Sequence, residues 1–403
     1  MSTSTPADSL NISGKHKLSG LDHLRAFAIV FVFLFHYQFY GHPEWENKIG
    51  SFGWTGVDLF FVLSGFLIAG QLFSTIAKGK SIAIKEFFIK RFFRIIPPYL
   101  IVIALYAFVP FLREREHFAA LWKYLTFTFN FALDLHQTGT FTHAWSLCVE
   151  EQFYLILPLT FWLFNYFKAG KKAIYLIASL FIGGFMIRYA GWHYLIEPQL
   201  LGDGIGAVWN EFIYYPTYNR LDGLLTGVSI AGIYTFYPHI KAKAGKYSHV
   251  LMLTGLAILI VSYFVATPQA SLSTTIWGFP LISVGYGLVL AAVVCPGNIL
   301  YKLKSTITTQ IATLSYGIYL VHKLMIHLTQ SLLSATGMDK NSNLMMLCCI
   351  ISSVAGALIL RYAVEKPSLK LRDRVLLKWQ RDHSLNTSLA IKPLVGVKTP
   401  AKG

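Results

Sequence analysis

The sequence predicts an all-α, polytopic integral membrane bundle with about ten transmembrane helices and both termini in the cytoplasm. Of the 403 residues, 54% are hydrophobic and 13% are charged, and the mean hydropathy is +0.51, which is far from the usual composition of a soluble domain. The apolar residues gather in stretches of about 20, the length that crosses a hydrocarbon core of about 30 Å. Most of the 35 lysines and arginines fall in alternate loops, as the positive-inside rule requires.

The ten predicted spans lie at residues 24–40, 54–75, 95–112, 146–167, 173–190, 219–236, 249–267, 275–295, 311–332 and 343–364. A further apolar run at 121–133 is too short to cross a bilayer, so we expect it to be re-entrant or interfacial. Counting this run as a span would put Lys168, Lys171 and Lys172 on the outer side, against the positive-inside rule.

The chain divides into a polar N-terminal tail (1–20), a transmembrane domain (21–365) and a basic C-terminal tail (366–403), with both tails in the cytoplasm. The first helix lacks a small-residue cleavage site, so the N-terminus is a poor signal peptide. The loop asymmetry explains most of the net charge of +16, and no basic–aromatic module indicates a nucleic-acid partner. The four cysteines lack metal-ligand spacing, so no metal site is expected.

The first span, "LDHLRAFAIVFVFLFH", carries Arg25 and His36. Eleven residues along a helix return to within about 20° of the same face and advance about 16 Å. The two side chains therefore follow one track, with Arg25 at the cytoplasmic end and His36 in the outer third. Because ionisable groups inside a membrane are costly and usually face partners or a water-filled path, we expect partners at both depths.

The outer half of the bundle collects further ionisable residues near the depth of His36, namely Asp58, Glu150, Glu151, Arg220 and Asp222. A histidine polarised by a carboxylate is a competent general base near neutral pH, so this layer suits proton abstraction. The alternative is a structural histidine–carboxylate pair that fixes helix packing, and position alone favours neither.

The segment "SIAIKEFFIKRFFRIIPPY" is amphipathic, and we expect an interfacial helix at the inner surface. Pro97 and Pro98 are expected to break this helix and to start the next span. Arg91 and Arg94 share a face and can bind phosphates bidentately. With Arg25 they form a layer of three cations that suits a nucleotide or coenzyme. The alternative role is a juxtamembrane anchor on anionic lipid.

Seven motifs follow one another between about residues 18 and 375: "LDHLRAFAIVFVFLFH", "GVDLFFVLSGFLI", "FIKRFFRIIPPY", "WSLCVEEQFYLILP", "RLDGLLTG", "LSYGIYLVHKLMI" and "AVEKPS". In this combination the sequence resembles the integral membrane acyltransferase-3 family, of the O-antigen and peptidoglycan O-acetylase type. Some members carry a soluble extracytoplasmic domain after the membrane part, and we expect none here.

The resemblance implies a multi-pass enzyme of the inner membrane. Such an enzyme transfers an acyl group, commonly acetyl from cytoplasmic acetyl-CoA, to a hydroxyl of an extracytoplasmic carbohydrate. It implies no permanently bound cofactor, and its partners are acyl-CoA, the glycan acceptor and membrane lipid. The family's three site motifs fall, in chain order, on Arg25 and His36, on Arg91 and Arg94, and on Trp145, Ser146 and Glu150.

These two layers predict a mechanism in which the CoA phosphates bind the arginines and His36 takes a proton from a sugar hydroxyl. Asp58 or Glu150 would orient the imidazole, as the third member of a triad orients its base. A covalent route through acylated His36 stays open. Ser146 is expected to position or cap rather than to attack.

The remaining candidate residues are predicted to contact the acceptor: Trp145, Ser146, Glu151, Arg220, Asp222 and His322. For His322 a polar interhelical contact is an equal alternative. The aromatic segment 191–218 is expected to cap the outer mouth and contact the sugar, although interfacial anchoring is the plainer explanation. The alternative function is a secondary transporter or an exporter of an envelope precursor, but no internal repeat supports it.

Overall fold

The computed structural model describes residues 18–135, 138–168, 170–200 and 204–390. The predicted tails therefore lie partly outside the described residues. Within the described residues the regular secondary structure is helical, with no strand. This confirms the predicted all-α class.

Each of the ten predicted spans coincides with one long helix: α1 (Ser19–Tyr37), α3 (Gly56–Ala77), α4 (Ile84–Phe108), α6 (Ala144–Tyr166), α7 (Ala173–Gly191), α9 (Leu221–Phe236), α11 (Ser248–Val265), α12 (Phe279–Val293), α14 (Thr306–Ser334) and α15 (Asn343–Leu360). Within the described part of the chain, eight helical segments are long and apolar enough to cross a membrane. The other two predicted spans are α9, with 16 residues, and α4, whose first turns are charged. The chain is a multi-pass membrane protein.

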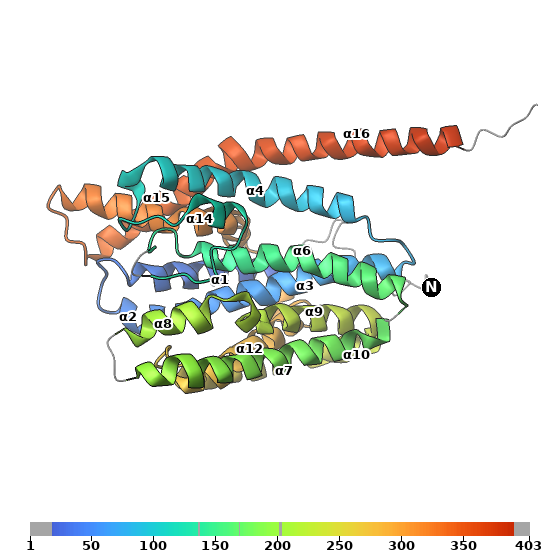
Figure 1. Cartoon of the computed structure of the whole chain (residues 1–403), viewed down its shortest axis with the longest axis horizontal. Helices are drawn as coiled ribbons and strands as arrows, with labels where there is room; N and C mark the ends of the chain where they lie inside the picture. Colours follow the sequence, from blue (N-terminus) through green and yellow to red (C-terminus); the bar gives the residue numbers. More distant parts are fainter. Residues whose placement is uncertain (1–17, 136–137, 169, 201–203, 391–403) are drawn as a thin grey trace, which may run out of the picture.

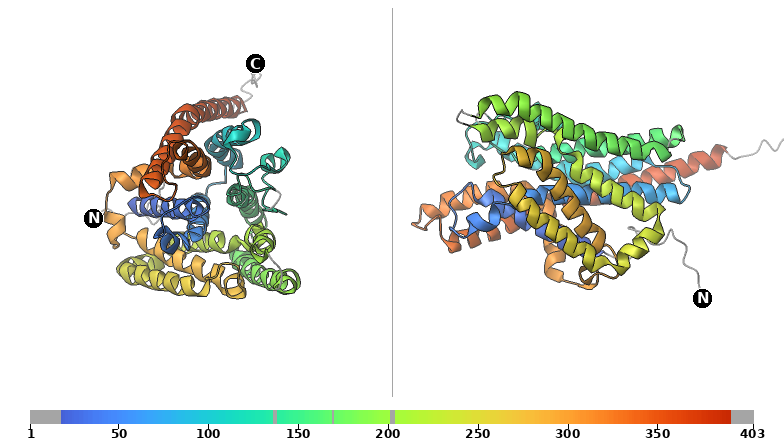
Figure 2. Two further views of the ribbon diagram at one scale, coloured as in Figure 1. Left: turned by 90° about the vertical axis from the view of Figure 1, so that its left-hand side faces the viewer. Right: turned by 90° about the horizontal axis from the view of Figure 1, so that it is seen from below.

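Most of the long helices run in a similar direction (Figure 1), whereas α11 and α12 (yellow to gold) cross the others obliquely when seen from below (Figure 2). Viewed from one end, α1 and α3 (blue) lie in the middle and the other helices surround them (Figure 2). The first helix packs against α3 and α14, and α3 packs along α9. By contrast, α7 and α11 are mostly exposed, as expected for helices that face lipid.

The contact between α3 and α9 depends on glycines. A Cβ atom on Gly65 would meet the backbone oxygen of Leu224, and one on Gly227 would meet the backbone oxygen of Val62. Small residues let two membrane helices approach until their backbones touch. The two glycines therefore set the spacing of the central helix pair.

The structure corrects the prediction for α4. Instead of an interfacial helix broken at Pro97 and Pro98, α4 continues through both prolines from Ile84 to Phe108. Proline is tolerated inside a membrane helix where neighbouring side chains bind the backbone groups that it disturbs. Pro97 and Pro98 leave the backbone oxygens of the residues four positions earlier, Phe93 and Arg94, without their usual donors. The hydroxyl of Tyr316 on α14 donates to the adjacent backbone oxygen, that of Ile95, at 2.8 Å.

Two short helices, α2 (Glu46–Gly50) and α8 (Ile205–Trp209), lie at the end of the bundle that we call the outer end, at the left of Figure 1. A third short helix, α5 (Leu121–Leu125), contacts α4, where the hydroxyl of Tyr99 donates to the backbone oxygen of Tyr124. The apolar run 121–133 contains only α5 followed by turns, so it does not span the membrane. The aromatic segment 191–218 forms short helical turns, apart from 201–203, which lie outside the described residues.

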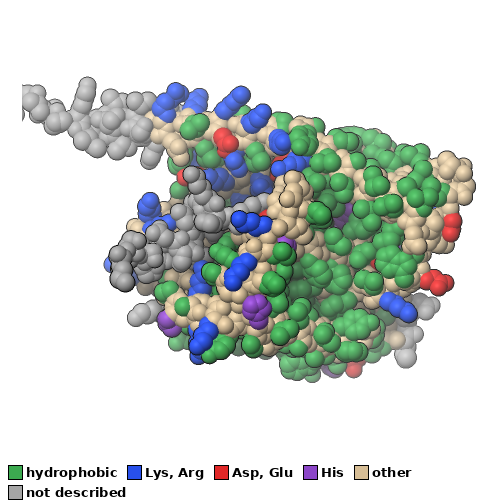
Figure 3. Space-filling model, turned by 180° about the vertical axis from the view of Figure 1, so that it is seen from behind, with side chains coloured by type: hydrophobic (Ala, Val, Ile, Leu, Met, Phe, Trp, Pro, Cys, Tyr) green, Lys and Arg blue, Asp and Glu red, His purple; other side chains and the backbone are tan. Residues whose placement is uncertain are grey.

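At the opposite, inner end, α16 (Lys366–Ala390) continues from α15 through one π-helical turn at Arg361–Glu365. It extends well beyond the bundle (Figure 1). The space-filling view shows a broad hydrophobic surface, with lysines and arginines concentrated towards the end from which α16 extends (Figure 3). This distribution matches the positive-inside rule with the inner end in the cytoplasm.

Candidate active site

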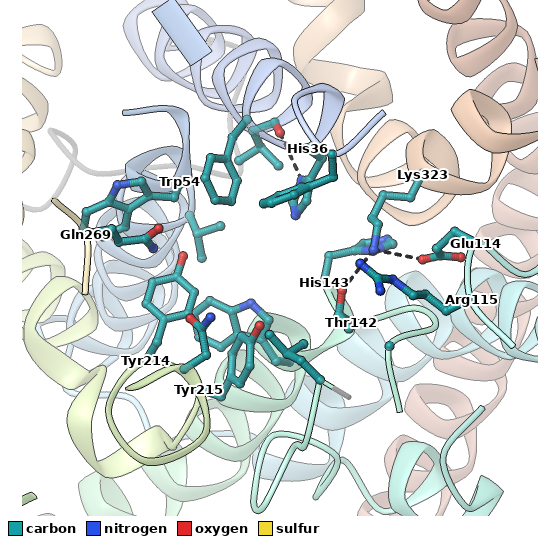
Figure 4. A pocket seen from close by; sticks show the side chains of 18 of the residues that line it. His36, Trp54, Glu114, Arg115, Thr142, His143, Tyr214, Tyr215, Gln269 and Lys323 are labelled. Carbon is teal, nitrogen blue, oxygen red and sulfur yellow. Dashed lines mark hydrogen bonds and ion pairs between the residues drawn. The ribbon is translucent and has the colours of Figure 1, made fainter. Parts of the chain in front are cut away.

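A cavity of about 290 Å³ lies near the outer end of the bundle, and we call it the outer cavity. Aromatic side chains, including Trp54, Tyr214 and Tyr215, form one side of it, while His36 and His143 lie towards the other (Figure 4). Burial raises the pKa of the Tyr215 phenol above its ordinary value, so this side chain lines the cavity as a neutral hydroxyl. Aromatic faces with polar edges are suited to sugar rings.

A second cavity, of about 110 Å³, lies deeper, and we call it the inner cavity. It is lined by Arg25, Arg91 and Arg94 together with Glu150 and Glu151. The same three arginines also line a vestibule of about 750 Å³ at the inner end. The inner cavity and the vestibule are therefore contiguous.

His36 of α1 is held by a hydrogen-bonded chain that begins on α14. The Nδ1 atom of His322 lies 2.8 Å from the backbone oxygen of Tyr319, and the Nε2 atom of His322 lies 3.0 Å from Nδ1 of His36. A carbonyl oxygen only accepts, so His322 carries its hydrogen on Nδ1 and, as a neutral ring, accepts at Nε2. His36 therefore donates from Nδ1, and its own Nε2 keeps the lone pair.

This tautomer is the one that a general base needs. His36 is 9% exposed and lines the outer cavity, where Figure 4 shows its ring. A second acceptor for the Nδ1 hydrogen is the backbone oxygen of Val32, at 3.0 Å. Both contacts place the hydrogen of His36 on Nδ1. Its basic nitrogen, Nε2, therefore takes no part in holding the ring.

A third histidine joins this pair. The ring centroid of His143 lies 5.7 Å from that of His36 and 4.8 Å from that of His322. His143 is fully buried against this cluster, and neither of its ring nitrogens has a hydrogen-bond partner among the described residues. The sequence did not predict a role for His143, because it lies in the loop directly before α6. The position of a loop residue along the membrane normal cannot be calculated from the helical rise. Three histidines thus meet at the inner wall of the outer cavity.

The nearest ion pair to this cluster joins Lys323 and Glu114. The Nζ atom of Lys323 lies 2.9 Å from Oε1 of Glu114 and donates to Oγ1 of Thr142 at 3.0 Å. Glu114 is not among the predicted residues, because a carboxylate in a charged outer loop normally faces water. The signal that could have found it is Lys323 itself, since a lysine within a span requires a partner.

The carboxylate Asp58 does not orient His36, in contrast to the expected arrangement. Its Oδ1 atom accepts from Arg220 at 2.8 Å, and the guanidinium of Arg220 stacks 4.1 Å from the ring of Phe279. Asp222 likewise pairs with Arg188 at 2.6 Å. Both ion pairs are buried. Each carboxylate therefore pairs with an arginine from a neighbouring segment and not with a histidine at the same depth.

Glu150 also lies away from His36. Its carboxylate accepts from the hydroxyls of Ser64, at 2.7 Å, and Tyr154, at 3.3 Å, and it faces the inner cavity with Glu151. It belongs to the arginine layer, because its position on α6 is six residues after Ala144, the first residue of that helix, which is nearly two turns deeper. The structure therefore places the two predicted catalytic carboxylates outside the histidine cluster.

A single layer of side chains separates the two cavities. The hydroxyls of Ser146 and Tyr319 lie 2.6 Å apart, and the Tyr319 hydroxyl donates to the backbone oxygen of His143 at 2.8 Å. Ser146 and Tyr319 line the inner cavity, whereas His143 and Trp145 line the outer one. Val57 contacts both cavities. The predicted residues Trp145 and Ser146 thus lie on opposite sides of the same layer.

The three arginines meet as their depths predicted, from α1 and α4. In the part of the chain that the structure describes, none of them forms an ion pair. The guanidinium of Arg91 lies 5.3 Å from the ring of Tyr154. Since the guanidinium groups face the inner cavity and the vestibule rather than the lipid surface, the layer can bind an anion that enters from the inner end.

Comparison with known proteins identifies related sequences. The model of a family described as "Acyltransferase domain" matches residues 18–362. The chain is 30% identical over 328 residues to the O-acetyltransferase OatA of Staphylococcus aureus, covering 76% of this chain and 50% of that protein. It is 29% identical over 335 residues to the peptidoglycan O-acetyltransferase OatA of Listeria monocytogenes, covering 78% and 50%.

A third relative is the putative peptidoglycan O-acetyltransferase YrhL of Bacillus subtilis, which is 28% identical over 324 residues, covering 76% of this chain and 48% of that protein. The chain thus spans about half the length of the curated relatives that it matches. No solved structure matches. Among the described residues, no group of three histidine, cysteine or acidic side chains is placed to hold a metal ion.

Proposed function

Since this chain belongs to the acyltransferase family whose domain covers most of its length, we propose that it is a membrane O-acyltransferase. It takes an acyl group, which we propose to be acetyl, from acyl-CoA at the inner end. It passes this group to a hydroxyl of a glycan in the outer cavity. The observation that carries the proposal is the hydrogen-bonded chain that leaves Nε2 of His36 free in that cavity.

The donor side of the proposal rests on charge and space. The inner cavity and the vestibule supply three arginines without ion pairs among the described residues, and the phosphates of CoA are suited to such a layer. Arg25 and His36 are separated by about 16 Å along α1, a span that an extended pantetheine arm can bridge. The anionic-lipid alternative is less favoured, because the arginines line an internal space.

The reaction on the acceptor side follows from the tautomer of His36. Its Nε2 takes the proton of the sugar hydroxyl as the oxygen attacks the thioester carbonyl. The carbon–sulfur bond then breaks, and the imidazolium returns the proton to the departing thiolate. His322 positions His36, in the role expected from sequence for Asp58 or Glu150. An acyl-histidine route would use the same nitrogen as nucleophile.

The experiment is a deletion of the gene in its host, complemented with wild type, His36→Ala or His327→Gln. Envelope and exported glycans are then examined by NMR for base-labile acyl groups. His327 lies on the same helix as His322 and does not line either cavity, so it is the matched control. We expect one acyl signal to disappear on deletion and to return with wild type and His327→Gln but not with His36→Ala.

The donor is tested on the purified protein with labelled acetyl-CoA. Arg91→Gln should weaken binding by about tenfold, the loss expected for one charge-assisted contact, whereas Lys304→Gln, an exposed cation at the inner end, should not. If the deletion leaves every glycan acyl group in place and the purified protein leaves the thioester intact, the acyltransferase proposal is wrong. The transporter or exporter alternative would then take its place.

A further inference from the structure

The loop beside the outer cavity carries four consecutive charged residues, Arg113, Glu114, Arg115 and Glu116, of which Glu114 and Arg115 line the cavity. Arg113 donates to the backbone oxygens of Tyr106 and Ala107, both at 2.7 Å, and so caps the end of α4. Glu114 pairs with Lys323 and accepts from a backbone amide. Arg113 and Glu114 therefore have partners within the protein, while Glu116 is exposed and does not line the cavity.

Arg115 differs from Arg113 and Glu114 in the contacts of its side chain. Its backbone oxygen accepts from Oγ1 of Thr140 at 2.8 Å, and its aliphatic stem packs against Gly139, where a Cβ atom would lie 2.9 Å from Cγ and Cδ of the arginine. These contacts fix the stem, while the guanidinium lines the outer cavity. Figure 4 shows it beside His143 and the Lys323–Glu114 pair. Among the described residues its guanidinium forms no ion pair.

The guanidinium of Arg115 thus lines the cavity without an ion-pair partner among the described residues. Glu114 and Lys323 neutralise one another, and the opposite side of the cavity offers aromatic rings and the amides of Asn210 and Gln269. Rings and amides suit the neutral part of a sugar, whereas a guanidinium fork matches a carboxylate or a phosphate. Arg115 is exposed, so a solute that enters the cavity can reach its guanidinium.

We propose that the outer cavity takes a sugar bearing an anionic substituent, a carboxylate or a phosphate, which binds Arg115 while a hydroxyl of the same molecule faces His36. The proposal rests on the proposed function only in treating the outer cavity as the acceptor site. It names the chemical class of the acceptor, an acidic rather than a neutral glycan.

The test measures binding to the purified full-length protein in nanodiscs, with no acyl donor present. The readout is the intrinsic fluorescence of Trp54 and Trp145, which line the cavity. The probes are methyl glucuronide and methyl galacturonide, glucose 6-phosphate and galactose 6-phosphate, and the neutral methyl glucoside and methyl galactoside. Wild type is compared with Arg115→Gln and with Lys48→Gln, which removes an exposed outer charge that does not line the cavity.

At least one anionic probe should bind wild type about tenfold more tightly than its neutral counterpart, the gain expected for a charge-assisted pair. This preference should weaken with salt, should be lost in Arg115→Gln and should persist in Lys48→Gln. A preference for uronides identifies a carboxylate, and a preference for sugar phosphates identifies a phosphate. Equal binding of all six probes, no binding of any, or a preference that survives Arg115→Gln overturns the proposal.

The two proposals fail separately. If acyl transfer to a host glycan is shown while the probes reveal no preference for an anion, the acceptor is neutral and the acyltransferase function stands. If the anion preference is found but the thioester stays intact, the cavity binds acidic sugars in a protein that does not transfer acyl groups.

Discussion

The imidazole rings of His36 and His322, from the first and the ninth long helices, share a hydrogen bond of 3.0 Å between Nδ1 of His36 and Nε2 of His322. Because His322 is itself fixed by backbone oxygens of its own helix, the pair sets the tautomer of His36 without a carboxylate. This differs from the usual arrangement in which an acidic side chain orients a catalytic histidine.

Replacing His322 should therefore reduce the rate of acyl transfer. In His322→Leu the ring of His36 loses one of its two acceptors and keeps only the backbone oxygen of Val32. We expect the turnover rate to fall by a factor on the order of 10² with little change in the KM for acyl-CoA. In His322→Gln an amide oxygen can accept in its place, so part of the rate should return. Single-turnover kinetics on the purified variants check this, with His327→Gln as control. A leucine variant with the wild-type rate would show that His322 only packs.

The ion pair of Asp58 and Arg220 should govern stability rather than the chemical step. Removing one partner of a buried pair leaves an unpaired charge and costs about 3–5 kcal/mol. We expect Asp58→Asn to lower the midpoint of thermal unfolding in detergent markedly, whereas His36→Ala, which leaves no buried charge, should not. The double variant Asp58→Asn with Arg220→Met should regain part of the loss. An Asp58→Asn protein with wild-type stability and no activity would instead make Asp58 catalytic.

Glu114 and Lys323 should be energetically coupled. Their side chains are 4% and 8% exposed, so the partner left by a single substitution stays buried. A double-mutant cycle with Glu114→Gln and Lys323→Met should give an interaction energy of about 0.5–3 kcal/mol. The measurement is unfolding monitored by fluorescence, and the pair Glu116→Gln with Lys48→Met serves as control. Additive effects would mean that the two side chains act independently.

Gly227 should not tolerate a larger side chain. A Cβ atom there would meet the backbone of α3, and overpacking costs about 1–3 kcal/mol, so Gly227→Ala should destabilise the protein. A Cβ atom on Gly183 of α7 would have no neighbour within 4 Å, so Gly183→Ala should be neutral or stabilising by up to about 1 kcal/mol. Comparison of the two unfolding midpoints checks the prediction, and equal shifts would contradict it.

The span positions and the arginine layer follow from sequence, because hydropathy and helical rise fix where a residue lies along the membrane normal. Arg25 and His36 illustrate this, since their spacing places one at each cavity. Depth alone does not show which helix faces which, so the partners of Asp58 and Glu150 were not predictable. The same limit applies to His143 and Glu114, whose loop positions concealed that both pack against α14 residues.

The proline pair in α4 shows a different limit. Pro97 and Pro98 normally mark a helix start, yet here they lie inside one helix. Next to the prolines, the hydroxyl of Tyr316, more than two hundred residues away in the chain, binds the backbone oxygen of Ile95. A local pattern cannot reveal such a distant hydroxyl, so the break predicted at these prolines was wrong.

The thin layer of Ser146, Tyr319 and His143 between the two cavities has a physiological consequence. A protein with solvent-accessible spaces reaching in from both faces of an energised membrane risks dissipating the proton-motive force. This packed, hydrogen-bonded layer lies between the two cavities, together with Val57. Under the proposed function it would have to let an acyl group pass without admitting ions. In an energised membrane, the proton barrier within this protein would thus depend on a layer one side chain thick.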